Sequence, residues 1–178
     1  KLTPVRSIIF INLTDDYERN FTMKAAVFSD THTNIALCLE AVRRCRPDVI
    51  IHLGDHERDA MAIAQQFPDI PMYNVCGNCD LAPVSPTAET VQLGPVKAFI
   101  THGHLYNVDY DRVDSLVYAA QEQDCKLAMF GHTHRPLYQE VGGVTVLNPG
   151  TAGKGQKLTW ALVEIFDNGG IICSIQDL

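Results

Sequence analysis

The chain has 178 residues and a mass of 19.7 kDa, which fits one domain with a sizeable buried core. Apolar residues make up 46% of it and charged residues 20%, values that exclude a largely disordered chain. The 14 basic and 21 acidic residues give a net charge of −7, and no block of basic residues occurs, which argues against a nucleic-acid-coating surface. No apolar run reaches the roughly 18 residues of a membrane-spanning helix, so membrane insertion is not expected.

The first 22 residues differ in pattern from the rest of the chain. Residues 1–22 combine a short apolar run with a charged patch at Asp15–Arg19, and they lack the long apolar region and the cleavage site of a signal peptide. Met23 is followed directly by a strand-like segment. We therefore predict that residues 1–22 are an N-terminal extension, either upstream or non-native, and that residues 23–178 form a single domain. The alternative is a native edge strand at Ser7–Ile11.

From Met23 onward, apolar runs of strand length alternate with segments of helical periodicity. The first half has predicted strands at 24–29, 48–53 and 72–76, with predicted helices at 34–44 and 57–67. Such an alternation is typical of a parallel sheet with right-handed crossovers.

The second half is richer in strands. One helix is predicted at 111–123, and strands are predicted at 89–93, 96–101, 126–130, 137–141, 144–148, 158–165 and 170–175. Turn signals such as Gly94-Pro95 and Asn168-Gly169-Gly170 favour antiparallel neighbours. The predicted fold class is therefore α/β: a two-sheet α/β sandwich with a parallel-rich N-terminal half and an antiparallel-rich C-terminal half.

Residues of metal-ligand type follow five of the predicted strands. They occur in Asp30-Thr31-His32, Gly54-Asp55-His56, Gly77-Asn78-Cys79-Asp80, Thr101-His102-Gly103-His104 and Gly131-His132-Thr133-His134. Each motif alone is explained by a turn, a helix cap or a surface residue, but five such strand ends are hard to obtain by chance. The carboxyl ends of strands are where ligands bind in α/β folds. Imidazole, carboxylate and amide oxygen suit divalent ions such as Mn²⁺, Fe²⁺, Zn²⁺ or Ni²⁺.

This donor set suits a centre of two metal ions. A single Asp between two sites can bridge them, and ions about 3.5–4 Å apart can hold a shared hydroxide and clamp the attacking and leaving oxygens of a phosphoryl group. The cations would also give an acidic protein the local positive charge that a phosphate ester needs.

The five motifs, in this order, resemble those of the calcineurin-like metallophosphoesterases, and the resemblance runs from Met23 to near Leu178. The small size and the Gly-Asn-Cys-Asp motif are similar to the compact bacterial and archaeal phosphodiesterase branch, which also resembles the retromer scaffold subunit. The family implies in-line attack by a metal-bridging hydroxide on a small phosphodiester or phosphomonoester, with no covalent intermediate. It also implies a homodimer or homotetramer.

The resemblance assigns ligands residue by residue. The implied cofactors are two divalent ions, Mn²⁺ first, with Ni²⁺, Fe²⁺, Zn²⁺ or Co²⁺ as alternatives. The implied bridge is Asp55. The first ion would be held by Asp30, His32 and His134, and the second by Asn78, His102 and His132.

Cys79 departs from the family pattern, because many members have His there, as a general acid or a phosphate contact. A thiol is a weaker hydrogen-bond donor and a poorer proton source for an alkoxide. We count Cys79 as a catalytic candidate beside Asp55 and Asn78. His104 is a candidate replacement proton donor, with a supporting or solvent-exposed role as its alternative. Because of this departure, a second function stays possible: a catalytically weak protein-binding scaffold like the retromer subunit. A nuclease is a further alternative, which the acidic net charge disfavours.

The six cysteines are interpreted as mostly reduced core residues of a cytoplasmic protein. A redox pair of Cys76 and Cys79 is the alternative for the Cys-Gly-Asn-Cys segment. His52, inside an apolar strand, is expected to be a satisfied core histidine. His56, next to Asp55, is a candidate substrate contact, with a role away from the substrate as its alternative. Basic side chains near the motifs are interpreted as surface or salt-bridge residues rather than phosphate contacts. They are Arg58, Arg112 and Arg135.

Overall fold

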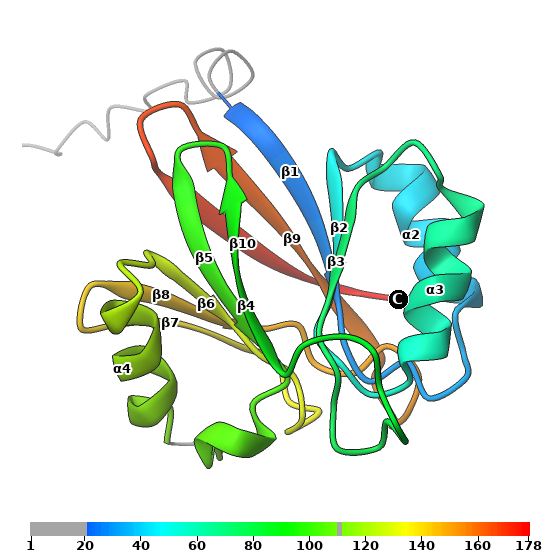
Figure 1. The fold of residues 1–178 in the computed structure, drawn as a ribbon. Coiled ribbons are helices and arrows are strands. Elements are labelled where there is room, and N and C mark those ends of the chain that lie inside the picture. The colour runs from blue at the N-terminus through cyan, green and yellow to red at the C-terminus, as the bar shows by residue number, and fades with distance from the viewer. Residues whose placement is uncertain (1–20, 110–111) are drawn as a thin grey trace, which may run out of the picture.

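The computed structural model describes residues 21–109 and 112–178, which form two sheets of five strands each. Figure 1 shows both sheets and the helices beside them. The first sheet has the order β10-β9-β1-β2-β3 and the second β4-β5-β6-β8-β7. In the first sheet the strands are β1 (Phe21–Phe28), β2 (Val49–His52), β3 (Met72–Asn74), β9 (Thr159–Phe166) and β10 (Ile171–Asp177). In the second they are β4 (Ala88–Leu93), β5 (Val96–Thr101), β6 (Leu127–Met129), β7 (Leu137–Val141) and β8 (Val144–Asn148).

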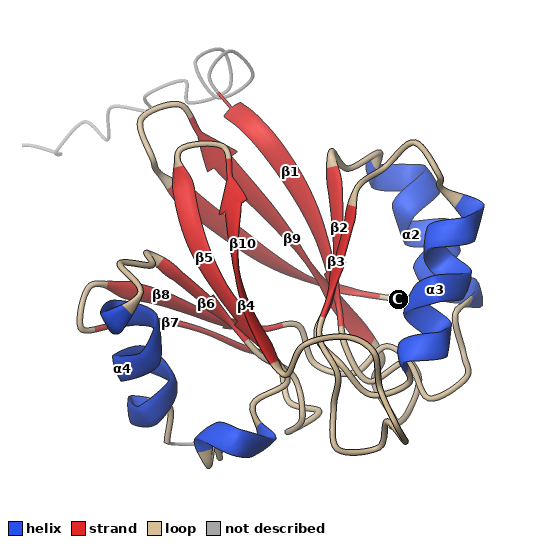
Figure 2. Cartoon of the chain, in the orientation of Figure 1, coloured by secondary structure: helices blue, strands red, loops and turns tan. Residues whose placement is uncertain are grey.

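The helices lie on the outer faces of the sheets. Figure 2 shows α2 (Ala36–Cys45) and α3 (Glu57–Gln66) beside the first sheet and α4 (Asp114–Glu122) beside the second. A short 3₁₀ helix, η1 (His104–Tyr106), follows β5. This arrangement confirms the predicted α/β sandwich. Within the described residues, no helix is long and apolar enough to cross a membrane.

The first half of the sequence forms parallel strand pairs and the second half mostly antiparallel ones, but this division does not coincide with the two sheets. β1, β2 and β3 pair in parallel, whereas the second half has three antiparallel pairs, β4–β5, β7–β8 and β9–β10, and two parallel ones. The last two strands nevertheless return to the first sheet, where β9 runs antiparallel to β1. Each sheet is therefore mixed.

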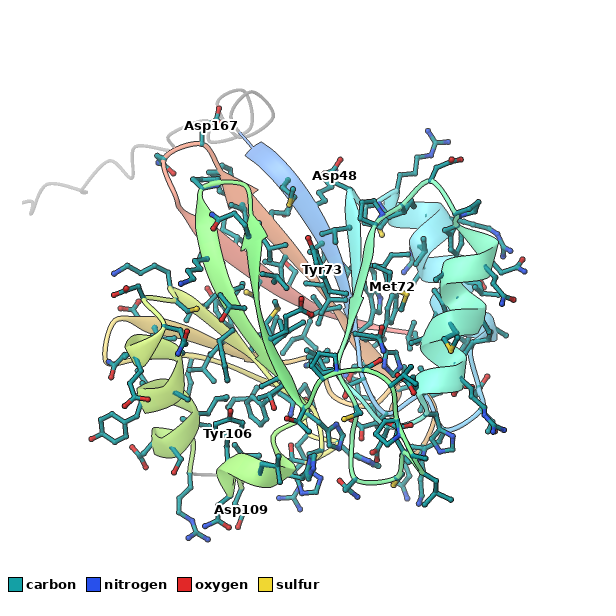
Figure 3. The ribbon with its side chains drawn as sticks, viewed as in Figure 1. Asp48, Met72, Tyr73, Tyr106, Asp109 and Asp167 are labelled. Atoms are coloured by element: carbon teal, nitrogen blue, oxygen red, sulfur yellow. The ribbon has the colours of Figure 1, made fainter. Side chains whose placement is uncertain are left out.

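The main core lies between the two sheets, and strand alternation decides which side chains enter it. In β1, Ala25 and Val27 join the core between the sheets, while Ala26 and Phe28 pack on the helix side. Phe28 stacks on the buried Trp160, with ring centroids 5.6 Å apart. Figure 3 shows the same alternation at β3, where Met72 points toward the helices and Tyr73 between the sheets.

The element boundaries agree with the expected ones to within a few residues. α3 ends at Gln66, as expected ahead of Pro68. The helix expected from residue 111 begins only at Asp114. β1 begins at Phe21, two residues before Met23, and the alternative strand at Ser7–Ile11 lies outside the described residues, so the domain boundary stays a prediction.

Candidate metal centre

The ligand-type motifs of both sheets meet at one end of the molecule. β1, β2 and β3 of the first sheet and β5 and β6 of the second all end there, and Figure 1 shows the loops that follow them gathered at the bottom of the view. Since parallel strands put their carboxyl ends at the same edge, five segments distant in sequence come together.

The first cluster consists of Asp30, His32, Asp55 and His134. One ligand atom from each of these residues lies within 4.8 Å of the others. The two imidazole Nε2 atoms of His32 and His134 are 3.4 Å apart, and Nε2 of His134 is 3.0 Å from Oδ1 of Asp30. Two carboxylates and two imidazoles at this spacing form a donor set suited to a divalent cation.

Hydrogen bonds decide which oxygen of Asp30 faces the cluster. Oδ2 accepts from the Ser29 hydroxyl at 2.5 Å and from the backbone N–H of His132 at 3.2 Å. Oδ1 is buried and accepts no hydrogen bond of good geometry within the described part of the chain, although His134 is close. A buried, charged oxygen left in this way is costly unless a cation balances it.

A second cluster forms around His102. Its Nδ1–H donates to the carbonyl of Leu53 at 2.7 Å, since a carbonyl only accepts. In the neutral ring Nε2 is then unprotonated, and it lies 3.1 Å from Oδ1 of Asn78 and 3.4 Å from Oδ1 of Asp55. Three acceptors facing one another repel unless a cation lies among them. The His132 ring, 5.2 Å from that of His102, completes the group.

The surroundings favour neutral imidazoles at His32 and His132 and a charged carboxylate at Asp55. Burial lowers the pKa values of His32 and His132. Burial alone would raise the pKa of Asp55, but hydrogen bonds from the thiol and backbone N–H of Cys79, with the neighbouring His102, lower it overall. The Asp30 carboxylate, 3.0 Å from Nε2 of His134, raises the pKa of that imidazole. A metal would have to displace that proton.

The backbone at these loops is unusual. Positive φ angles occur at Asp30 (55°), Asp55 (58°), His132 (66°) and His134 (57°), in the left-handed region that side chains rarely adopt. Glycine is required nearby, because a Cβ on Gly77 would overlap Asp55. One on Gly131 would likewise overlap Ser29 and approach Oδ2 of Asp30 at 2.9 Å.

A buried hydrogen-bond chain supports the first cluster from behind. The N–H of Gly54 donates to Nδ1 of His52 at 3.3 Å, so Nε2 carries the proton and donates to the Thr31 hydroxyl at 3.1 Å. That hydroxyl donates to Oδ2 of Asp59 at 2.7 Å, which also accepts the N–H of Thr33 at 2.7 Å. His52 is thus a satisfied core histidine, as expected, and burial lowers its pKa to about 4.

Several supporting residues were not expected from the sequence. Thr31 and Asp59 hold the Asp30–His32 loop, and Asn148 donates to the Gly131 carbonyl at 2.7 Å and the Thr133 hydroxyl at 3.1 Å. The sequence gives no signal for these contacts, because each joins segments far apart along the chain. Asp80 also accepts the N–H of Gly77 at 2.8 Å, the kind of role a short carboxylate often has.

The remaining candidates lie around the two clusters. Cys79 is exposed and donates its N–H to Oδ1 of Asp55 at 2.9 Å. The thiol also hydrogen-bonds this carboxylate, which raises the pKa of Cys79 to about 11. His104 lies with its ring 5.4 Å from that of His102, and its buried Nδ1 has no hydrogen-bond partner among the described residues. The ring of His56 is 4.9 Å from that of His32.

The cysteines form no disulfide among themselves, and the three arginines singled out in the sequence lie on the surface. All six cysteines are described and unpaired, Cys76 and Cys79 included. Arg112 forms an exposed ion pair with Asp109 at 3.7 Å, and Arg58 and Arg135 are exposed.

The sequence matches the family model of the calcineurin-like phosphoesterase superfamily domain over residues 23–168. A probable metallophosphoesterase of Mycoplasma genitalium is 31% identical over 131 residues, which cover 72% of this chain and 77% of that protein. A phosphodiesterase of Methanocaldococcus jannaschii is 27% identical over 147 residues, covering 72% and 83%. The structure of Vps29 complexed with Zn²⁺ from Entamoeba histolytica has a TM-score of 0.70 at 23% identity, covering 87% and 99% of the two chains, and shows a shared fold.

The family match extends across all five motif loops and so confirms the resemblance found in the motifs. The protein belongs to the calcineurin-like phosphoesterase superfamily.

Proposed function

We propose that this protein is a phosphodiesterase that uses two divalent metal ions. The observation that carries the proposal is the pair of facing clusters that share Asp55, one around Asp30 and one around His102. The relatives named as metallophosphoesterases, and the one named as a phosphodiesterase, support the same reaction class.

The proposed ligands divide between the two sheets. Asp30, His32 and His134 would hold the first ion, with Asp55 between the two. Asn78, His102 and His132 would hold the second. Two such ions activate a water as nucleophile and neutralise charge on the phosphoryl oxygens. Mn²⁺ is our first choice, and Zn²⁺, Ni²⁺, Fe²⁺ and Co²⁺ suit the same donors.

The protein's own groups prepare this site. The carbonyl of Leu53 fixes the tautomer of His102 and leaves Nε2 free to bind. His104 and Cys79 flank the second cluster, where the leaving oxygen needs a proton. We assign His104 the better donor role, because a protonated imidazole is a much stronger acid than the thiol of Cys79, whose pKa is raised to about 11 beside Asp55.

The test is hydrolysis of bis(p-nitrophenyl) phosphate by chelator-treated protein, with and without added Mn²⁺, alongside the bound-metal content per chain. We expect activity only with metal, and two ions per chain. Asp55→Asn and His132→Ala should lose metal and most activity. Full metal content and full activity in both variants would overturn the proposal.

A scaffold without turnover is the less favoured function. Structures of Vps29 share the fold, and Cys79 stands where many family members have His. Every position to which the family assigns a ligand nevertheless carries a ligand-type residue here. A stoichiometric protein partner, together with no hydrolysis under any of the five metals, would favour the scaffold. The homodimer or homotetramer and the cytoplasmic location stay predictions.

A further inference from the structure

A cavity of about 420 Å³ lies beside the metal centre. Its walls come from the first turns of α3 and from the loop at residues 79–84. His56 and Cys79 line the cavity and also contact cluster residues: the ring of His56 is 4.9 Å from that of His32, and the N–H of Cys79 donates to Asp55. A phosphoester held at the clusters would therefore have room for its alcohol part in this cavity, whose size falls in the roughly 300–1,000 Å³ range of ligand pockets.

Three exposed apolar side chains line the cavity. Met61, Leu81 and Val84 are 53%, 95% and 86% exposed. Single apolar side chains on a surface are ordinary, but three around one cavity beside a polar centre form a surface that an apolar ligand would cover.

The cavity wall is held in place by hydrogen bonds from the loop to α3. The carboxylate of Glu57 accepts from the backbone N–H groups of Ser85 at 2.7 Å and Val84 at 3.2 Å, and from the Ser85 hydroxyl. Asp80 in turn accepts the N–H of Glu57 at 2.7 Å and that of Gly77 at 2.8 Å. The wall is therefore preformed, which lowers the entropic cost of binding.

The same bonds occupy the two carboxylates that line the cavity, so neither is paired with its guanidinium. Both oxygens of Glu57 and of Asp80 already accept hydrogen bonds from the protein. Arg58 also lines the cavity, and within residues 21–109 and 112–178 no carboxylate forms an ion pair with it. A guanidinium left unpaired favours an anionic group on the ligand, and it can also stack on a planar ring.

We propose that this cavity binds the alcohol part of the substrate, and that this alcohol is an aromatic group carrying a second anionic substituent. Met61, Leu81 and Val84 contact the ring, and Arg58 pairs with the anion. The inference rests on the proposed function, since it needs the phosphoryl group at the metal clusters. A second cavity of about 240 Å³, lined by Phe130, Thr133 and Leu137 among others, is not part of the proposal.

The experiment measures binding of phosphonates, which are not hydrolysed, to the Zn²⁺-loaded protein. Calorimetry compares the dissociation constants of methylphosphonate, phenylphosphonate and 4-carboxyphenylphosphonate. We expect phenylphosphonate to bind about tenfold more tightly than methylphosphonate, because the ring is buried, and the carboxylate to add about a further fivefold. Methyl-¹³C methionine spectra should show Met61 shifting with phenylphosphonate and hardly at all with methylphosphonate, with the fully buried Met129 as an internal reference.

Variants separate the two contributions. Met61→Ser combined with Leu81→Ser should remove the preference for the phenyl ring, and Arg58→Gln should remove only the gain from the carboxylate. Tyr118→Ser, at an exposed aromatic on α4, should leave both unchanged. Equal binding of phenylphosphonate and methylphosphonate, or an unshifted Met61, would overturn this inference while metal-dependent hydrolysis still stood. Failure of hydrolysis with every metal would instead overturn the proposed function.

Discussion

The thiol of Cys79 hydrogen-bonds the Asp55 carboxylate, which both side-chain clusters share. Hydrogen bonding to Asp55 raises the pKa of Cys79 to about 11, so the thiol stays protonated and contributes a weak hydrogen bond. At this position the side chain stabilises the charged form of Asp55 but is a poor source of a proton for an alkoxide. A comparison of substrates with good and poor leaving groups should therefore reveal the effect of Cys79 on the rate.

We expect Cys79→His to raise kcat for diesters with alkyl leaving groups by about tenfold or more, because an imidazole donates a proton that a poor leaving group needs. Diesters of p-nitrophenol should change little, since that group leaves without protonation. Cys79 is exposed, so the larger ring has room. Steady-state kinetics on both substrates, with Cys79→Ser as the control, test this; an equal fall on both substrates would contradict it.

The chain from His52 through Thr31 to Asp59 positions the loop that carries Asp30 and His32. Thr31→Val keeps the shape of the side chain but leaves the buried N–H of His52 without its acceptor. We expect metal affinity to fall by about 10–100-fold, as for other residues that support ligands. Titration with Zn²⁺ measures this, and Thr145→Val, at the amino end of β8, is the matched control. Unchanged metal affinity in Thr31→Val would show that these hydrogen bonds do not position the ligand-type residues.

His52 also predicts a pH dependence of stability. Its pKa is lowered from about 6.5 in the unfolded chain to about 4 in the folded one. Between these values the unfolded state binds more protons, so the free energy of unfolding should fall as the pH falls from 6.5 toward 4. His52→Gln should flatten, without abolishing, the slope in metal-free protein, since burial lowers the pKa values of His32 and His132 too. Urea unfolding at several pH values tests this; an identical slope would contradict it.

At the scale of the elements, the loops after the strands depend on glycine for close approach. The position of Gly77 has no room for a Cβ beside Asp55. We expect Gly77→Ala to displace that carboxylate and lower metal content by about tenfold or more, a cost like that of other changes around ligands. Gly170→Ala, in the turn between β9 and β10, is the control, because its nearest neighbour is the flexible side chain of Asn168. Figure 3 shows Asp167 of this turn at the opposite end of the molecule. Normal metal content in Gly77→Ala would refute the argument.

The strands, and the loops that carry the ligand-type residues, could be predicted because their signals are local. An apolar run such as that before Asp30 identifies a strand, and the carboxyl-end rule places the polar residues after it. The return of β9 and β10 to the first sheet could not be predicted. Their apolar pattern fits an edge of either sheet, so the sequence does not say which sheet they join. The chain His52–Thr31–Asp59 and the left-handed backbone at His132 and His134 depend on contacts between distant segments, and no local pattern encodes them.

At the scale of the whole molecule, the proposed metal ligands join the two sheets. Asp30, His32 and Asp55 follow strands of the first sheet, whereas His102, His132 and His134 follow strands of the second. Without a cation, the buried carboxylate of Asp30 and the facing acceptors around His102 weaken the contact at this end of the sandwich. Metal binding should therefore stabilise the entire fold and not the loops alone.

A ligand at about 100 times its dissociation constant stabilises the folded state by about 2.7 kcal/mol, which for a chain of this size corresponds to a rise in Tm of roughly 5–10 °C. We expect chelation to lower Tm by this amount, and re-addition of Mn²⁺ or Zn²⁺ to restore it, in scanning calorimetry at constant pH. Asp55→Asn should melt at one temperature with or without metal, whereas Cys79→Ser should keep the shift. A metal-independent Tm in the unaltered protein would mean that the two sheets hold together without the ions. The clusters would then have to be balanced by protons on residues such as His134, whose pKa is already raised by Asp30.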